Sequence, residues 1–336
     1  MSLDELAAAS AQIEELQRAN VRLQRQLIQA KAKTAALVDA VELAARDAAV
    51  TVGRPTAPRV RPSRSKKSSE TVIVHASDWQ CGKHTESFNS EVLAQRISLL
   101  ADKVATLVEI QRSDHPVDDA VLILGGDMVE GVSIFPGQAW EIDSTLYDQL
   151  FTCARITEQL IVDLLSIVPR VQVVAEYGNH GRLGRKGDHP GSDNIDLMCY
   201  RIVAERTQSD RVTWQYGPGW YQLLEHGNYR ALVVHGDEVK SFGGQTPAFG
   251  IARKCNAWAT GVVPGGCTDV WMGHWHQPLV IPMAHGQGRI FVNPSPESDN
   301  TYAKEFVAAT GTPGQRVNFV NPERGRVTAE YVVWLD

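Results

Sequence analysis

Apolar residues recur every seven positions through the first 48 residues, and residues 3–48 contain no Pro or Gly. A repeat of this kind predicts a coiled-coil helix. Asn20 falls at a core position, where a buried Asn favours a parallel two-stranded register. We therefore predict a homodimer formed through residues 3–48; the alternative is one amphipathic helix packed on its own chain. The core positions are Leu6, Ala9, Ile13, Leu16, Asn20, Leu23, Leu27, Ala30, Thr34, Leu37, Val41 and Ala44.

Residues 49–70 interrupt this pattern. They hold three prolines, four serines and six Lys or Arg residues, with few apolar side chains. Such a composition predicts a linker, and a solvated tether is the favoured interpretation of its basic cluster. The chain thus divides into a coiled-coil helix (residues 1–48), a basic linker (49–70) and a folded domain (71–336).

From residue 71 onward, short apolar runs alternate with segments of helical spacing. Helices are predicted near residues 90–110, 144–167 and 194–206. Strands are predicted at TVIVHAS, AVLIL and VQVVAE, and then in closer succession at RVTWQY, WYQLL, RALVVH, DVWM, RIFVN, RVNFV and VTAEYVVWL. An early βαβ region followed by many strands predicts an α/β fold with a large, mixed sheet.

Composition is that of a soluble globular protein, with 43% hydrophobic and 21% charged residues in a chain of 336. The net charge of −6 argues against a protein that coats nucleic acid, so any such contact has to be local. Five cysteines without C-x-x-C spacing argue against a disulfide framework or a zinc knuckle. No run approaches the roughly 20 apolar residues of a membrane span. We therefore predict a cytoplasmic protein with no membrane contact.

Five apolar runs end abruptly in polar residues that can bind metals. The runs read VIVHASDWQ, VLILGGD, VQVVAEYGNH, ALVVHGD and DVWMGHWH, and they place Asp78, Asp127, Asn179, His180, His235, His274 and His276. Side chains at the ends of buried strands can converge on one point without disturbing the fold. Carboxylate, amide and imidazole groups together suit divalent metals. The pattern predicts a two-metal hydrolase.

The ordered set of Asp78, GGD, GNH, His235 and GHWH resembles the calcineurin-like metallophosphoesterase family over residues 71–300, and in particular its exonuclease-type and phage-type members. The resemblance implies a β-sandwich flanked by helices. It also implies two adjacent metals bridged by Asp127. Asp78 and His276 would complete the protein ligands of the first metal, while Asn179, His235 and His274 would hold the second.

The same resemblance assigns His180 to protonating the leaving oxygen or stabilising the transition state, with Asn179 and Asp127 as the other catalytic residues. The family's first motif is usually D-x-H, but here Gln80 stands in the third position. A neutral Gln carbonyl binds a transition metal less tightly than imidazole does. We therefore predict a weakened first site that is biased towards Mn²⁺ or Mg²⁺. For the two ions together we predict Mn²⁺, with Mg²⁺, Zn²⁺ and Fe²⁺ as alternatives. His75 and His84 lie nearby, and a core or helix-start histidine is the favoured interpretation of each.

A further departure is that Gly181 and Arg182 follow His180, where many relatives have an acidic residue. The group that orients the His180 ring must therefore come from elsewhere, and Asp188 and Asp196 are candidates.

Arg182, Arg185 and Lys186 follow the His180 segment and are candidate ligands for substrate phosphates. An exposed loop with ordinary surface charge is an equal alternative. Among the tryptophans, Trp79 and Trp275 are candidates for stacking on bases, whereas Trp140, Trp214 and Trp220 are expected to pack in the fold.

The leading functional hypothesis is a metal-dependent phosphoesterase that cleaves phosphodiester bonds of DNA or nucleotides by attack of a metal-bridging hydroxide. One alternative is a small-molecule phosphomonoesterase or cyclic-nucleotide phosphodiesterase. The other is a coiled-coil assembly subunit with a weakened metal site, which the loss of the first-motif histidine favours and the otherwise full ligand set opposes.

Overall fold

The chain forms two units, Met1–Thr51 and Val52–Asp336. The computed structural model describes residues 15, 18–26, 29, 32, 36, 39, 43, 54–135, 137–184, 186–187, 189–240, 247–284, 288–297 and 311–336. The described residues of the first unit are helical, as the sequence pattern predicts. Of the predicted core positions, Asn20 and Leu23 are described and both are exposed, with Leu23 65% exposed. The coiled coil and its partner stay predictions, and most heptad positions lie outside the described residues.

The basic segment at residues 54–69 belongs to the second unit and contacts the rest of it. The Arg54 guanidinium donates a hydrogen bond to the Gln208 carbonyl (3.1 Å), and the Arg211 guanidinium donates one to the Pro58 carbonyl (3.0 Å). The backbone N–H of Ser63 donates to Asp118 (2.9 Å). Most residues of this stretch are exposed, as expected for a solvated segment, but these hydrogen bonds hold it along the surface of the domain.

The larger sheet has six strands in the order β11-β10-β1-β2-β3-β4. Its strands are β1 (Glu70–Ala76), β2 (Val117–Leu124), β3 (Arg170–Ala175), β4 (Val212–Tyr216), β10 (Gly314–Asn321) and β11 (Arg326–Trp334). The first four are parallel, while β10 runs antiparallel to β1 and β11 antiparallel to β10. The parallel arrangement brings the carboxyl ends of β1, β2 and β3 to one edge.

The smaller sheet has five strands in the order β5-β6-β7-β9-β8. They are β5 (Gln222–His226), β6 (Tyr229–Val234), β7 (Asp269–Met272), β8 (Val280–Pro282) and β9 (Arg289–Val292). Strands β6, β7 and β9 are parallel, and β5 and β8 are antiparallel edges. The predicted large, mixed sheet is thus the six-stranded one, and five strands of the strand-rich half build a second, smaller sheet.

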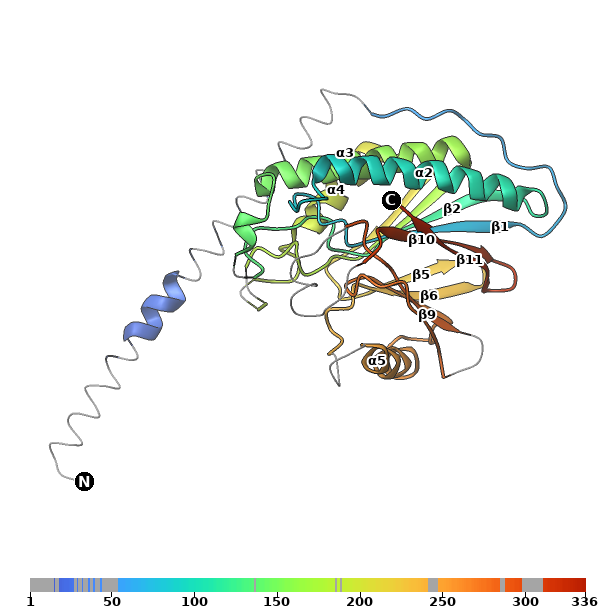
Figure 1. The fold of residues 1–336 in the computed structure, drawn as a ribbon. Helices are drawn as coiled ribbons and strands as arrows, with labels where there is room; N and C mark the ends of the chain where they lie inside the picture. Colours follow the sequence, from blue (N-terminus) through green and yellow to red (C-terminus); the bar gives the residue numbers. More distant parts are fainter. Residues whose placement is uncertain are drawn as a thin grey trace. The chain divides into compact units, whose positions relative to one another are not determined.

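The two sheets pack face to face, with helices outside them (Figure 1). Apolar residues of both sheets form the core between them, among them Ile73, Val121 and Val174 from one sheet and Val233, Trp271 and Phe291 from the other. Helices α2 (Ser90–Arg112), α3 (Leu146–Ile167) and α4 (Ile195–Thr207) cover the larger sheet, and α5 (Ala248–Gly261) covers the smaller one. The sandwich flanked by helices that the resemblance implied is thus the observed arrangement.

Local signals explain where the helices begin. The side chains of Asn89, Thr145 and Asn194 each accept hydrogen bonds from backbone N–H groups in the first turn of α2, α3 and α4. Sequence patterns missed α5, whose segment contains Gly250 and Gly261 and so has a weak helical signal. Tertiary packing compensates, because the buried face of α5 contacts the outer face of the smaller sheet. Within the described residues, no helix combines the length and the hydropathy needed to cross a membrane.

Candidate metal centre

The predicted ligands gather where strands of both sheets end. Asp78 follows β1, Asp127 follows β2, Asn179 and His180 follow β3, His235 follows β6, and His274 and His276 follow β7. Strands β1 to β3 are parallel in one sheet and β6 and β7 are parallel in the other, so their loops meet at one edge of the sandwich.

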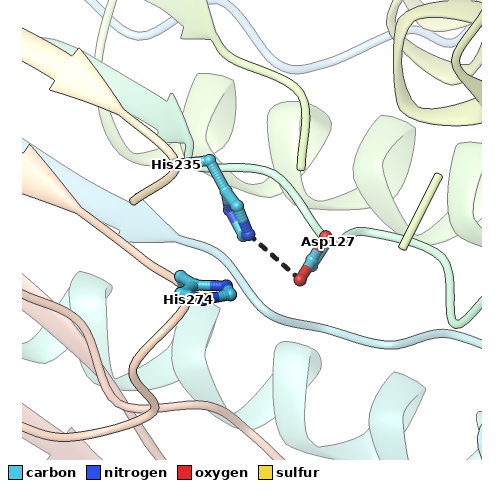
Figure 2. Close-up of side chains that lie close together, drawn as sticks. All are labelled: Asp127, His235 and His274. Carbon is cyan, nitrogen blue, oxygen red and sulfur yellow. Dashed lines mark ion pairs between the residues drawn. The ribbon is translucent and has the colours of Figure 1, made fainter. Parts of the chain in front are cut away.

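Asp127, His235 and His274 form the tightest cluster, with one candidate ligand atom from each lying within 4.8 Å of the others. Figure 2 shows the two imidazoles facing the Asp127 carboxylate, with Asp127 Oδ2 3.1 Å from His235 Nε2. Their loops come from different sheets, so the tertiary fold creates this cluster. Carboxylate and imidazole at this spacing suit a divalent transition metal.

Backbone strain is concentrated on the predicted ligands. Among the described residues, those other than glycine with positive φ are Asp78, Gln80, Asp127, His274 and His276, with φ between 45° and 67°. Holding a residue other than glycine in this region costs on the order of 1–3 kcal/mol. The backbone conformation at these five positions sets the direction of their side chains. Folded proteins retain such an energetic cost mainly at functional sites.

The GGD and GNH loops contact each other through glycine backbone. A Cβ at Gly178 would lie 2.1 Å from Asp127 Oδ1, and one at Gly126 would lie 2.5 Å from the Gly178 nitrogen. Only glycine fits at either position without a shift. This contact places Asn179 beside Asp127.

On the side of the site where the second metal is predicted, which we call the second-metal side, several acceptor atoms lie around one point. His235 Nδ1 contacts the Gly125 carbonyl oxygen at 2.8 Å, which fixes Nδ1 as the donor and, in neutral His235, leaves the lone pair on Nε2. Asn179 Oδ1 and Asp127 Oδ2 each lie 3.1 Å from that Nε2. Such a group of acceptors needs a positive charge among them. Burial lowers the pKa of His235, but Asp127 outweighs burial and raises it well above its usual value. The residues fit a cation here.

The first-metal side is built on Asp78, which is fully buried. Its Oδ1 accepts a hydrogen bond from the His274 backbone N–H (2.8 Å) and lies 3.4 Å from His276 Nε2. The backbone N–H of Gln80 donates to the Asp127 carbonyl (2.9 Å). The Gln80 Oε1 atom is buried and has no hydrogen-bond partner. A buried carbonyl oxygen without a donor fits a metal ligand, which is the role predicted for Gln80.

His180 is positioned by Glu130, a residue that sequence reasoning missed. His180 Nδ1 lies 2.8 Å from the Glu130 carbonyl oxygen and 3.2 Å from its Oε2, while Nε2 lies 4.0 Å from Asp127 Oδ2. Burial lowers the pKa of His180, but Asp127 and Glu130 outweigh burial and raise it to about 10. The imidazole is therefore held as a proton donor. The sequence signal available for Glu130 is its position at the end of the segment GDMVE, three residues after Asp127.

Asp196 has a different role from the one considered for it. Its carboxylate accepts hydrogen bonds from the backbone N–H groups of Gly178 (2.9 Å), Met128 (3.2 Å) and Val129 (3.3 Å). Burial is the main reason that its pKa is raised, to about 6. Asp196 thus ties the GNH loop to the GGD loop, and does not contact the His180 ring. Asp188, the other candidate, lies outside the described residues.

The predicted phosphate-binding cations Arg182 and Lys186 both pair with Asp237, two residues after His235. Arg182 forms a hydrogen-bonded ion pair with Asp237 Oδ2, and Lys186 Nζ lies 3.1 Å from the same atom. Arg185 lies outside the described residues. These contacts hold the loop after His180 close to the second-metal side.

The structure also shows the burial of two tryptophans and two histidines that were considered from the sequence. Trp79 is fully buried, which excludes stacking on a base, whereas Trp140, expected to pack in the fold, is 91% exposed. His75 is a core histidine, fully buried against Trp271, and burial lowers its pKa to about 3. His84 is exposed. Neither histidine therefore replaces the missing ligand of the first motif.

Comparison with known proteins gives similarity to solved structures alone. No family model matches the chain, and no curated protein matches it. Vps29 of Entamoeba histolytica, crystallised with Zn²⁺, is 11% identical with a TM-score of 0.33, covering 79% of this chain and 99% of that chain. A predicted phosphoesterase of Streptococcus pneumoniae is 14% identical with a TM-score of 0.31, covering 79% and 98%. An archaeal phosphodiesterase is 11% identical with a TM-score of 0.34, covering 78% and 99%. These values are too low to support an argument about fold or activity.

Proposed function

We propose that this chain is a calcineurin-like metallophosphoesterase that hydrolyses phosphodiester bonds of DNA or nucleotides. The observation that carries the proposal is the convergence of acceptor atoms around His235 Nε2, supplied by Asp127 and Asn179 from the other sheet. Two divalent ions, proposed to be Mn²⁺, would activate water and neutralise charge on the phosphoryl oxygens when bound. Asp127 would bridge them, since a carboxylate has an oxygen for each.

The residues of the chain would divide the remaining work. His180, with its proton on Nε2 and its Nδ1 held by Glu130, is placed to protonate the leaving oxygen. Arg182, Arg185 and Lys186 would contact the phosphates of the substrate. Two of these cations pair with Asp237, two residues after His235, and would exchange this carboxylate for the phosphates of the substrate.

The direct test is a substrate panel with the full chain. Linear DNA, mononucleotides, cyclic nucleotides and an aryl phosphodiester are incubated with Mn²⁺, Mg²⁺ or Zn²⁺. Asp127→Ala is expected to lower DNA cleavage by about 10³-fold, because the metals supply several kcal/mol of transition-state stabilisation and each 1.36 kcal/mol is tenfold. Asp119→Ala is the matched control, since this carboxylate lies near the start of β2, away from the site, and pairs with Arg170 of the neighbouring strand β3.

The other outcomes separate the alternatives. Turnover of mononucleotides or cyclic nucleotides without DNA cleavage would replace the proposal with a small-molecule phosphoesterase. Absence of turnover with every metal would favour an assembly subunit whose metal site is weakened.

We also propose a homodimer formed through residues 3–48. The sequence repeat and the exposure of Leu23 support a helix whose apolar positions are covered by a second copy. Deletion of residues 1–50 should then convert a dimer to a monomer in light scattering. The same number of chains per particle before and after the deletion would contradict the dimer and leave the proposed chemistry intact.

A further inference from the structure

Lys83 and Glu297 form a buried ion pair beside the first-metal side. Lys83 Nζ lies 2.7 Å from Glu297 Oε1, and their side chains are only 3% and 2% exposed. A buried pair generally adds little to stability, because removing both charges from water costs about as much as their attraction returns. A pair in this position therefore calls for another role.

The second oxygen of Glu297 faces the predicted ligand His276. Glu297 Oε2 lies 3.6 Å from His276 Nδ1, and Nε2 of the same ring lies 3.4 Å from Asp78 Oδ1. The groups thus follow one another in the order Lys83, Glu297, His276 and Asp78. A carboxylate behind one ring nitrogen holds the proton there and leaves the other nitrogen free to bind a metal.

Ser295 fixes Glu297 relative to Asp78. The Ser295 hydroxyl donates a hydrogen bond to the Asp78 carbonyl (2.7 Å) and accepts one from the Glu297 backbone N–H (2.9 Å). Asn293 adds a second connection, because its side-chain amide donates to Ser77 Oγ (3.0 Å). The segment after β9 therefore holds Glu297 and Asp78 as one unit.

We propose that Glu297, held in place by Lys83, is the positioning residue of the first-metal ligand His276. The carboxylate directs the Nδ1 proton of His276 towards itself, so the Nε2 lone pair faces Asp78 and the ion. The neutral Gln80 is a weak ligand, and the first site depends correspondingly more on His276. This inference rests on the proposed function for the presence of a first metal.

Calorimetric titration of Mn²⁺ into the metal-free full chain tests the proposal. Wild type is expected to bind two ions. Glu297→Leu should weaken one binding event by about 10–100-fold, the usual effect of losing the carboxylate behind a metal-bound histidine, and leave the other unchanged. Glu297→Gln retains an oxygen acceptor and should recover part of the lost affinity. That partial recovery is not expected if Glu297 only fills space.

Glu70→Leu is the matched control, because Glu70 is a buried carboxylate at the opposite end of β1 from Asp78 and should leave both events unchanged. Wild-type affinity at both sites in Glu297→Leu would overturn the proposal, as would a single binding event in wild type. Equal weakening of both events would also overturn it, since it would indicate general disruption. The titration measures binding and does not depend on hydrolysis. A protein that binds two ions here but is inactive in the substrate panel therefore contradicts the proposed function alone.

Discussion

The two halves of the metal centre are built differently although both arise at strand ends. On the second-metal side, Asp127, Asn179 and His235 present acceptor atoms about one point and no Lys or Arg side chain lies among the described contacts of these atoms. On the first-metal side, Gln80 offers only a neutral oxygen, and the buried ammonium of Lys83 is held two contacts away from His276.

The two sides therefore balance their buried charges in different ways. On the second side, the carboxylate is balanced by a proton on His235 or by a cation, so an ion replaces a proton. On the first side, Lys83 already balances Glu297, and an ion must bind beside a fixed positive charge. We therefore expect the second site to fill first and the first site to exchange its ion more readily.

The largest expected effect comes from His180, which lies next to Asn179, a proposed ligand of the second metal. His180→Ala should lower kcat by about 10²–10⁴-fold, the usual contribution of a positioned proton donor. The pKa of His180 is raised to about 10, so the protonated ring is present at neutral pH and activity falls as pH rises through the pKa. Glu130→Gln removes a carboxylate that raises this pKa, and should move the basic limb of the pH profile to lower pH.

The control for this experiment is His84→Ala, which removes an exposed histidine close in sequence to the first motif. Its rate and pH profile should match wild type. An unshifted basic limb in Glu130→Gln would show that the limb reports another group, and a normal rate in His180→Ala would remove this residue from the mechanism.

A smaller effect is expected on the first-metal side, where Gln80→His would erase the contrast between the two halves. Restoring an imidazole should tighten the weaker binding event by about tenfold, equivalent to 1.4 kcal/mol. The gain should be larger for Zn²⁺ than for Mg²⁺, because imidazole suits Zn²⁺ better. Calorimetric titrations with each metal measure it, with the exposed Gln208→His as control. A gain at the stronger event, or equal gains for both metals, would contradict the assignment of Gln80.

The gathering of the candidate ligands could be predicted because each follows an apolar strand within one short motif. The contacts of Glu130, Asp196 and Glu297 could not, since only the tertiary fold creates them. Glu297 follows β9 in a segment without any metal-binding motif, yet it reaches Lys83 from the first loop. The spacing of the strand runs did not show which strands belong to which sheet, although the resemblance implied a sandwich. Strand runs indicate extended structure, but pairing partners are set by packing between the sheets.

The smallest effect tests whether the second-metal side tolerates changes that leave its ligands alone. Burial raises the pKa of Glu176 to about 9, against an ordinary value of 4.5. Between these values the folded state keeps a proton that the unfolded state has released, so stability falls as pH rises through this window.

Glu176→Gln mimics the protonated form. Gln cannot ionise, so the substitution should raise the free energy of unfolding at pH 9 by roughly 1 kcal/mol, the energy of about one pKa unit. Urea denaturation at pH 5 and pH 9 measures this gain, which should be negligible at pH 5 and absent at both pH values in the exposed control Glu225→Gln. Weakened Mn²⁺ binding in Glu176→Gln would instead make Glu176 part of the metal centre.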